Sequence, residues 1–400
     1  MQFEPGVYAG LLRRLARSSS PSPLRCVRQL HAHLALLGLL PLDSSFAARL
    51  AATYSRSGDL HSASLLLHYF PRPSTLLFNA LLRAHSLRSG PHDVLRLFRR
   101  MLALGLRLDH FTFPFALKSS ADIASLPLGR ALHSQSLRRG LELDAYVSSS
   151  LVNVYAKCGQ LKDAQRLFEA MTVRLPSAWN SLIAGYMSVG IFDAAENLFA
   201  IMPDKNIISW TAMISGYCQN GLADRALSLF QDMRRDDSKV KPNWVTVVSV
   251  LPACAHSADL EQGERIHQYA SVMGFDRHPT VQIALIGMYA KCGNLAKARL
   301  LFDRIPKRDK DVIAWNTMIT AYASHGHGQE AVSTFEDMLR AGIRPDPISF
   351  TGLLSGCSHS GVKSLPQAST NICMYLEDFP PEDKSQFMHA RTVSALTYVR

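Results

Sequence analysis

The sequence predicts an all-α fold, an α-solenoid built from tandem helix–turn–helix repeats. The first observation is a segment that occurs almost unchanged at 154–168 and 288–302, and in looser form at 53–67. Each copy has an aromatic residue, a glycine four positions later, a leucine two after that and an alanine three further on. The glycine ends one helix, and the later apolar residues start another at helical spacing. The copies therefore predict one helical hairpin repeated along the chain, and stacked hairpins form a solenoid.

The second observation is that the repeats follow one another without gaps. Three types alternate, two with 35 residues and one with 31. A segment of residues 1–7 precedes them, and a tail of residues 362–400 lacks the repeat pattern. The predicted repeats are about 8–43, 44–74, 75–109, 110–144, 145–175, 176–206, 207–243, 244–278, 279–311, 312–346 and a partial repeat 347–361.

The repeat 312–346 illustrates the third observation, an apolar stripe on each predicted helix. Apolar residues recur at steps of three and four, which places them on one helical face. Gly326 and Gly328 are expected to break the chain between the two helices. The stripes consist of Trp315, Met318, Ile319 and Tyr322 in the first helix and Ala331, Phe335 and Met338 in the second. Trp179 and Trp210 hold the position of Trp315 in their repeats, so all three are expected in the core rather than against a nucleic-acid base.

Charge is concentrated at the beginning of the chain. The net charge is +11, and residues 1–100 hold 13 arginines, no lysine and four acidic residues, a net +9. A basic surface favours an anionic partner such as nucleic acid. Part of this charge has a second reading, because residues 1–28 are rich in Arg and Ser with a single acid, as in organellar transit peptides.

The remaining composition excludes several classes of protein. No apolar run approaches the ~18 residues that a membrane-spanning helix needs, so no membrane partner is expected. The seven cysteines form no Cys-x-x-Cys pair and no zinc spacing with histidine. They are interpreted as small buried apolar residues in a reducing compartment.

The repeat motifs resemble those of plant pentatricopeptide repeat (PPR) proteins of the PLS subclass. The similarity covers about residues 8–361 and rests on the 35/35/31 alternation, on Tyr-Ala-Lys-Cys-Gly at 155–159, and on Trp-Asn-Ser-Leu-Ile-Ala-Gly-Tyr at 179–186 and Trp-Thr-Ala-Met-Ile-Ser-Gly-Tyr at 210–217. The resemblance implies a right-handed superhelix that binds single-stranded RNA, one base per repeat, as a specificity factor for RNA editing or other processing. It also implies a mitochondrion or chloroplast as the location, with the mitochondrion favoured.

By the same resemblance, residue five of a repeat and its last residue together read one base. Small polar side chains at a fixed place in each repeat are what such reading requires. The matching pairs are Asn79 with Asp109, Asn180 with Asn206, Thr211 with Asn243, and Asn316 with Asp346. The resemblance implies that they read U, pyrimidine, A and U. The alternative for each Asn or Thr is a helix cap near the start of its helix.

Apolar residues at position two of three repeats form a second set of candidate contacts. They are Leu76, Ile208 and Ile313. The resemblance implies packing against the faces of bases, and ordinary contacts at the start of a helix are the alternative. Five repeats carry no interpretable base-reading pair or belong to a type whose reading is doubtful, so the predicted RNA address is sparse.

The sequence predicts no enzyme. A zinc deaminase needs His-x-Glu with Pro-Cys-x-x-Cys, and neither motif occurs. The C-terminal extension and deaminase domains of the editing branch are absent from the sequence, so we expect no cofactor, no catalytic residue and no metal site. Any editing activity would be supplied in trans by a deaminase or editing factor, and a monomer is expected.

Two other readings remain open at this point. A related tetratricopeptide-like scaffold would bind protein rather than RNA, although the clustered arginines and the repeated Asn and Thr positions speak against it. The unrelated tail after residue 361 also fits a truncated product without independent function.

Overall fold

The computed structural model describes residues 10, 23–38, 44–68, 73–235 and 240–360. Within these residues every regular element is a helix, and the predicted all-α solenoid of helical hairpins is confirmed. None of the helices in this part of the chain is long and apolar enough to cross a membrane. The predicted terminal segments 1–7 and 362–400 lie outside the described residues.

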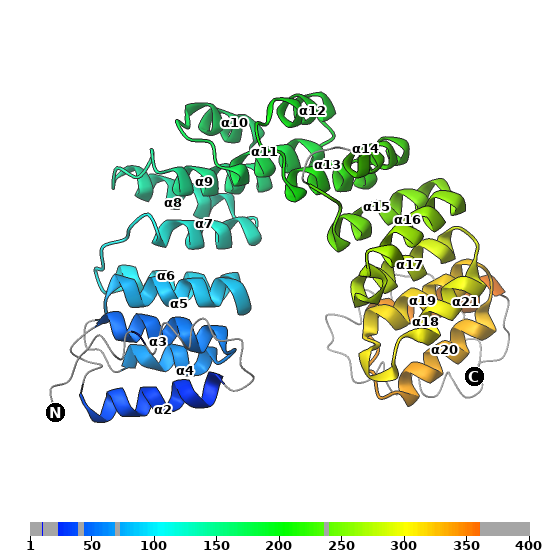
Figure 1. Cartoon of the computed structure of the whole chain (residues 1–400), viewed down its shortest axis with the longest axis horizontal. Helices are drawn as coiled ribbons and strands as arrows, with labels where there is room; N and C mark the ends of the chain where they lie inside the picture. Colours follow the sequence, from blue (N-terminus) through cyan, green and yellow to red (C-terminus); the bar gives the residue numbers. More distant parts are fainter. Residues whose placement is uncertain (1–9, 11–22, 39–43, 69–72, 236–239, 361–400) are drawn as a thin grey trace. The chain divides into compact units, whose positions relative to one another are not determined.

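The chain divides into two compact units, Met1–Asp204 and Lys205–Arg400, here called the N-terminal and C-terminal units. In both, consecutive helices form hairpins (Figure 1). The N-terminal unit contains α2 (Pro23–Leu36), α3 (Ser44–Arg56), α4 (Leu60–Leu65), the 3-10 helix η1 (Leu66–His68), α5 (Thr75–Arg88), α6 (Pro91–Ala103), α7 (Thr112–Asp122), α8 (Leu126–Leu137), α9 (Ala145–Lys157), α10 (Leu161–Ala170), α11 (Pro176–Ser188) and α12 (Phe192–Ile201). The C-terminal unit contains α13 (Ile207–Gln219), α14 (Ala223–Arg235), α15 (Trp244–Ser257), α16 (Leu260–Val272), η2 (Phe275–Arg277), α17 (Pro279–Lys291), α18 (Leu295–Arg304), η3 (Lys307–Asp309), α19 (Val312–Ser324), α20 (Gly328–Arg340) and α21 (Pro347–Ser360).

The duplicated segments fold in the same way. In both, a cysteine follows the last residue of the first helix, and after it comes a glycine in the left-handed region, Gly159 with φ 74° and Gly293 with φ 82°. The next amide then donates to the carbonyl of the preceding tyrosine, Gln160 to Tyr155 and Asn294 to Tyr289. Only glycine adopts this conformation without steric cost, and it satisfies carbonyls that the helix end leaves open. The second helix starts directly afterwards.

One expected turn residue lies elsewhere. Gly326 has φ 75° and forms the turn in its repeat, whereas Gly328 is the first residue of α20 and not a breaker. The helix starts there because the chain has already reversed at Gly326, and His327 is the N-cap residue of α20. Gly328 is buried at the start of this helix.

The three tryptophans are core residues, as expected. Trp179, Trp210 and Trp315 are 5–7% exposed. The ring of Trp315 packs edge-on against Phe302 of the preceding second helix, with centroids 5.0 Å apart, and Trp179 packs in the same way on Phe168 at 4.6 Å. Trp179 and Trp315 each thereby join one repeat to the previous one, as adjacent repeats do in a solenoid.

Within each compact unit the first helices of consecutive repeats pack closely on one another, as α3 on α5 and α19 on α21. Each second helix packs on the first helices beside it, whereas consecutive second helices make few direct contacts. The fold therefore has two layers. The layer of first helices is closely packed, and the layer of second helices leaves grooves between its members.

Candidate nucleic-acid interface

The predicted pair Asn79 and Asp109 is joined by direct hydrogen bonds. Asn79 is the fifth residue of α5, and its Nδ2 donates to Asp109 Oδ1 at 3.0 Å and lies 3.2 Å from Oδ2. Asp109 precedes α7, and its Oδ1 accepts from the amide of Thr112 at 2.9 Å. The last residue of one repeat is therefore held by the next helix while it fixes the amide of residue five.

Asn316 and Asp346 repeat this geometry in the C-terminal unit. Asn316 Nδ2 donates to Asp346 Oδ1 at 2.8 Å, and Asp346 Oδ1 accepts from the amide of Ser349 at 2.9 Å. Desolvation raises the pKa of Asp346, but hydrogen bonds from Ser349 and Asn316 outweigh it, so that the pKa lies below its usual value. An ionised carboxylate only accepts, which forces the nitrogen of the Asn316 amide to face it.

A third residue completes each network, and sequence reasoning missed it. Thr112 and Ser349 are the third residues of their repeats and are fully buried. The Thr112 hydroxyl lies 2.8 Å from Asn79 Oδ1 and from Asp109 Oδ1, and the Ser349 hydroxyl contacts Asn316 Oδ1 and Asp346 Oδ1 in the same way. The hydroxyl thus orients the amide oxygen while the carboxylate orients the amide nitrogen. The sequence signal is a Ser or Thr three residues after a capping residue.

Thr211 and Asn243 are connected through the same third position. Thr246 Oγ1 donates to Asn243 Oδ1 at 3.1 Å and lies 3.0 Å from Thr211 Oγ1. Either hydroxyl can donate in the contact between them, and when Thr246 gives its single proton to Asn243 Oδ1, Thr211 is the donor. Thr211 then presents acceptor lone pairs, and the Asn243 amide nitrogen, whose oxygen is occupied by Thr246, presents donors.

The fourth predicted pair is divided between the compact units. Asn180 lies on α11 in the N-terminal unit and is buried, and Asn206 lies in the C-terminal unit. Asn206 caps α13, with its side chain accepting from the amide of Ser209 at 3.0 Å. The expected helix-cap role therefore applies to Asn206, as it does to Asn243 on α15. Joint base reading by Asn180 and Asn206 stays a prediction.

The apolar residues at position two are exposed. Leu76, Ile208 and Ile313 are 55–65% exposed, although each sits at the start of a helix that has a buried face. Large exposed apolar side chains recur at this position in other repeats, as Phe111, Tyr146, Val245 and Ile348. These four residues were not among the candidate contacts predicted from the sequence. The signal that identifies them is an apolar residue at position two of the repeat. Their exposure leaves the ring or branched face available to a ligand.

Basic side chains are exposed in the arginine-rich first quarter. Arg96, Arg99 and Arg100 are exposed on α6, and of the three only Arg96 has an ion pair given by the structure, with Asp93 at 3.4 Å. Such solvated pairs contribute little and exchange readily for other anions.

The described residues hold no cluster of His, Cys, Asp or Glu that would bind a metal ion. Burial raises the pKa of Cys218 to about 11 and of Cys254 to about 12, so these thiols are protonated at neutral pH.

Comparison with known proteins gives the class of this protein and then its family. Models described as the PPR repeat and the PPR repeat family match residues 77–106, 146–174, 177–207, 205–256, 284–309 and 310–359. Together these matches cover more than half of the chain. The chain is a helical-repeat α-solenoid, and it belongs to the pentatricopeptide repeat family.

Several plant proteins are similar over most of this chain. A pentatricopeptide repeat-containing protein of Arabidopsis thaliana is 46% identical over 84% of this chain and 64% of its own length. CRR2, chloroplastic, of Arabidopsis thaliana is 34% identical over 80% of this chain and 44% of its own. OGR1, mitochondrial, of Oryza sativa subsp. japonica is 35% identical over 88% of this chain and 55% of its own. The chain thus spans between two fifths and two thirds of the length of these relatives.

Solved structures share the fold. The crystal structure of the pentatricopeptide repeat protein PPR10 from maize superposes with a TM-score of 0.60 and 18% identity, over 99% of this chain and 63% of that one. PPR10 in complex with an 18-nt psaJ RNA element superposes with a TM-score of 0.53 and 17% identity, over 90% of this chain and 58% of that one.

Proposed function

We propose that the chain binds single-stranded RNA along the first turns of its first helices, with one base facing each repeat. The observation that carries the proposal is the recurrent network in which residue five is oriented by the last residue of its repeat and by a buried hydroxyl of the next. It is present at Asn79 and Asn316 with Asp, and at Thr211 with Asn. The RNA complex of PPR10, whose fold this chain shares, supports the proposal.

The oriented amides suit uracil. In Asn79 one nitrogen proton is committed to Asp109 and one oxygen lone pair to Thr112, which leaves one donor and one acceptor in a fixed order. The pairing edge of uracil offers a carbonyl acceptor beside an N3–H donor, so both remaining amide positions are complementary to it. Asn316 has the same commitments and is proposed to read U as well.

The Thr211 and Asn243 pair suits adenine. Thr211 presents an acceptor for the adenine N6 amino group, and the Asn243 amide nitrogen presents a donor for N1. Uracil held in the same orientation would place its O4 acceptor against the Thr211 acceptor and its N3–H donor against the Asn243 donor. A base whose donors and acceptors oppose the site leaves polar groups unpaired, and this costs affinity.

The exposed apolar residues and the basic charge supply affinity that is independent of sequence. Leu76, Phe111 and Tyr146, at position two of consecutive repeats, are proposed to pack on base faces, which all four bases possess. Ile208 and Ile313 take the same role in the C-terminal unit. The arginines of residues 1–100 are proposed to neutralise phosphates.

The proposed role is that of a specificity factor for RNA editing or other RNA processing in a mitochondrion or chloroplast. Similar proteins bear the names chloroplastic and mitochondrial, which supports an organelle without choosing between them. In this proposal catalysis belongs to a partner such as a deaminase recruited in trans, and the purified chain leaves cytidine unchanged.

Selection of bound sequences from a random RNA pool tests the proposal. The expected enriched sequence is 5′-U-x-x-Y-A-x-x-U-3′, where Y is a pyrimidine and x is any base. Enrichment of an unrelated sequence would reject the assigned residues. Absence of RNA binding would reject the function and favour the protein-binding scaffold.

A further inference from the structure

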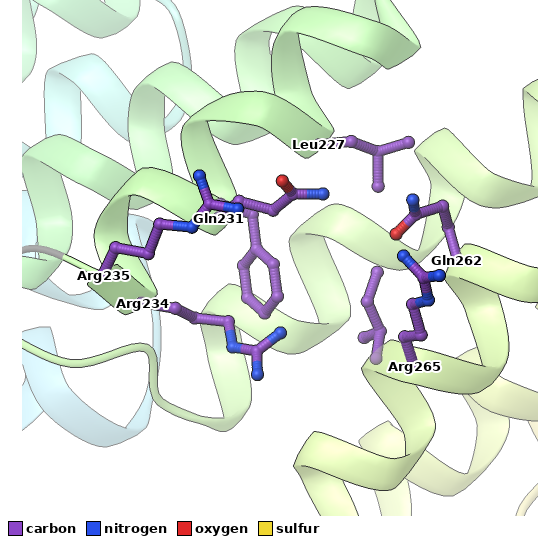
Figure 2. Close-up of a pocket in the computed structure, with 8 residues that line it drawn as sticks. Leu227, Gln231, Arg234, Arg235, Gln262 and Arg265 are labelled. Carbon is purple, nitrogen blue, oxygen red and sulfur yellow. The ribbon is translucent and has the colours of Figure 1, made fainter.

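A cavity of about 320 Å³ lies between the second helices α14 and α16 of the C-terminal unit. It exists because consecutive second helices make few direct contacts, so the groove between them is open. Figure 2 shows Gln231 and Arg234 on one wall and Gln262 and Arg265 on the other. Its floor is apolar and consists of Leu227, Phe230 and Ile266.

The walls are cationic. Three guanidinium groups line the cavity, those of Arg234, Arg235 and Arg265, and no carboxylate lines it. Of these three arginines, only Arg265 has an acidic partner among the described residues, Glu261 at 2.6 Å, and both side chains of this pair are more than half exposed. A pair so solvated contributes little to stability, so Arg265 can turn to another anion at small cost.

Arg234 is held in position for a ligand. Its guanidinium lies 4.8 Å from the centroid of the Tyr269 ring, over its face. The Tyr269 hydroxyl donates to the carbonyl of Pro242 at 3.2 Å, which fixes the ring. Lys241 adds a further positive charge nearby, with Nζ 3.4 Å from the Arg234 carbonyl oxygen. A guanidinium fixed by stacking loses less side-chain entropy when it binds a carboxylate.

The basic walls are not a consequence of the repeat. The equivalent cavity between α10 and α12 of the N-terminal unit, about 420 Å³, is lined instead by apolar residues such as Leu198 and Ile201. Its charged lining residues are Glu169 and Arg174, one of each sign. The cavity between α10 and α12 therefore has balanced charge, whereas the cavity between α14 and α16 is strongly cationic.

We infer that the cavity between α14 and α16 binds an acidic segment of a partner protein, in which carboxylates flank an aliphatic side chain. In this inference the guanidinium groups bind the carboxylates through paired hydrogen bonds, and Gln231 and Gln262 form hydrogen bonds with the peptide backbone. The aliphatic side chain packs against the apolar floor. RNA fits less well, because the proposed base-reading residues lie on first helices or just before them, whereas every residue that lines this cavity lies on a second helix. The inference does not depend on RNA binding.

The test uses the full chain and a fluorescein-labelled heptapeptide with a central Leu flanked on each side by Asp and Glu, followed by fluorescence anisotropy. The variant R234Q/R235Q/R265Q should bind the peptide at least about tenfold more weakly than wild type, because three charge-assisted contacts to its carboxylates are lost. The matched control R96Q/R99Q/R100Q removes the same charge from exposed positions of α6 and should bind as wild type does. A peptide with Asn and Gln in place of the acids should not bind.

Two further measurements keep the test decisive. R265Q alone changes an exposed side chain, so a folded R265Q protein that binds the peptide more weakly supports the site even if the triple variant unfolds. Equal loss in the α6 control would show a nonspecific charge effect and overturn the inference. Undiminished peptide binding by the triple variant would also overturn it. If the triple variant loses RNA binding but retains peptide binding, the cavity is a phosphate site instead. If the wild-type protein fails to bind RNA, only the proposed function is rejected.

Discussion

Replacement of the Thr112 hydroxyl isolates the network that orients Asn79. In T112V the side chain keeps its shape but can no longer bond Asn79 Oδ1 or Asp109 Oδ1, each 2.8 Å away. The amide of Asp109, which donates to Thr112 Oγ1 at 3.3 Å, also loses its acceptor. The control T112S keeps the hydroxyl and loses one methyl group.

The expected magnitude follows from burial. Thr112 is fully buried, whereas Asn79 and Asp109 are partly exposed, so water can replace part of what Asn79 loses. Removing one partner of such a buried network costs about 1–3 kcal/mol. For a compact unit of this size each kcal/mol lowers Tm by about 2–4 °C. T112S should lose about 0.8 kcal/mol for its methyl group.

Thermal unfolding by circular dichroism and RNA binding by anisotropy measure the two consequences. T112V should melt earlier than T112S and should lose its preference for U over the other bases at the position facing the repeat 75–109, while T112S retains that preference. A T112V protein that melts with wild type and still prefers U would refute the idea that the hydroxyl positions Asn79.

The remaining predictions concern packing, protonation and charge. Trp315→Ala should cost about 3–5 kcal/mol in thermal or denaturant unfolding without altering base preference, because Trp315 is buried against Phe302; an altered preference would place it at the RNA instead. Burial lowers the pKa of His133 and His267 below the usual 6.5. Their Nδ1 atoms lie 2.9 and 2.8 Å from the hydroxyls of Tyr155 and Tyr289, respectively. The unfolded chain therefore binds more protons as pH falls through 6.5, so Tm should decrease from pH 7 to pH 5, and less steeply in H133F/H267F; an equal decrease in that variant would exclude these histidines. RNA affinity should fall with salt at a logarithmic slope of about 0.7 per neutralised phosphate, and a duplex of the same sequence should bind more weakly; equal affinity at low and high salt would contradict the role of the arginines.

Much of the fold could be predicted because its determinants are local. The turn after Tyr155 needs a residue with positive φ, which Gly159 supplies. Gly293 supplies it in the second copy of the same sequence motif. The same locality limits precision, since Gly326 and Gly328 look equally able to end a helix and only Gly326 does so. Which of two nearby glycines forms the turn depends on how the second helix packs, and one repeat alone does not contain that information.

The candidate site was predicted in part because two of its three members had a known pattern. Asn79 and Asp109 are 30 residues apart, yet their positions in the repeat identify them. Thr112 was missed because its role arises from contacts to two residues at once, both of them in the preceding repeat. The basic cavity was not predicted for the same reason, since Arg234 and Arg265 line one cavity only when α14 and α16 lie side by side.

The central claim, that residue five and the last residue of a repeat read one base, is tested most directly by Thr211→Asn. The variant pairs an Asn with Asn243 and so creates the combination of Asn180 and Asn206. Two RNAs that differ only in the nucleotide facing this repeat, A in one and U in the other, are titrated against wild type and variant. Wild type should prefer A and the variant the pyrimidine, with a change in discrimination of about 1–3 kcal/mol, the usual value for one base contact. Equal preference for A in both proteins, or equal loss of affinity for both RNAs, would contradict the account.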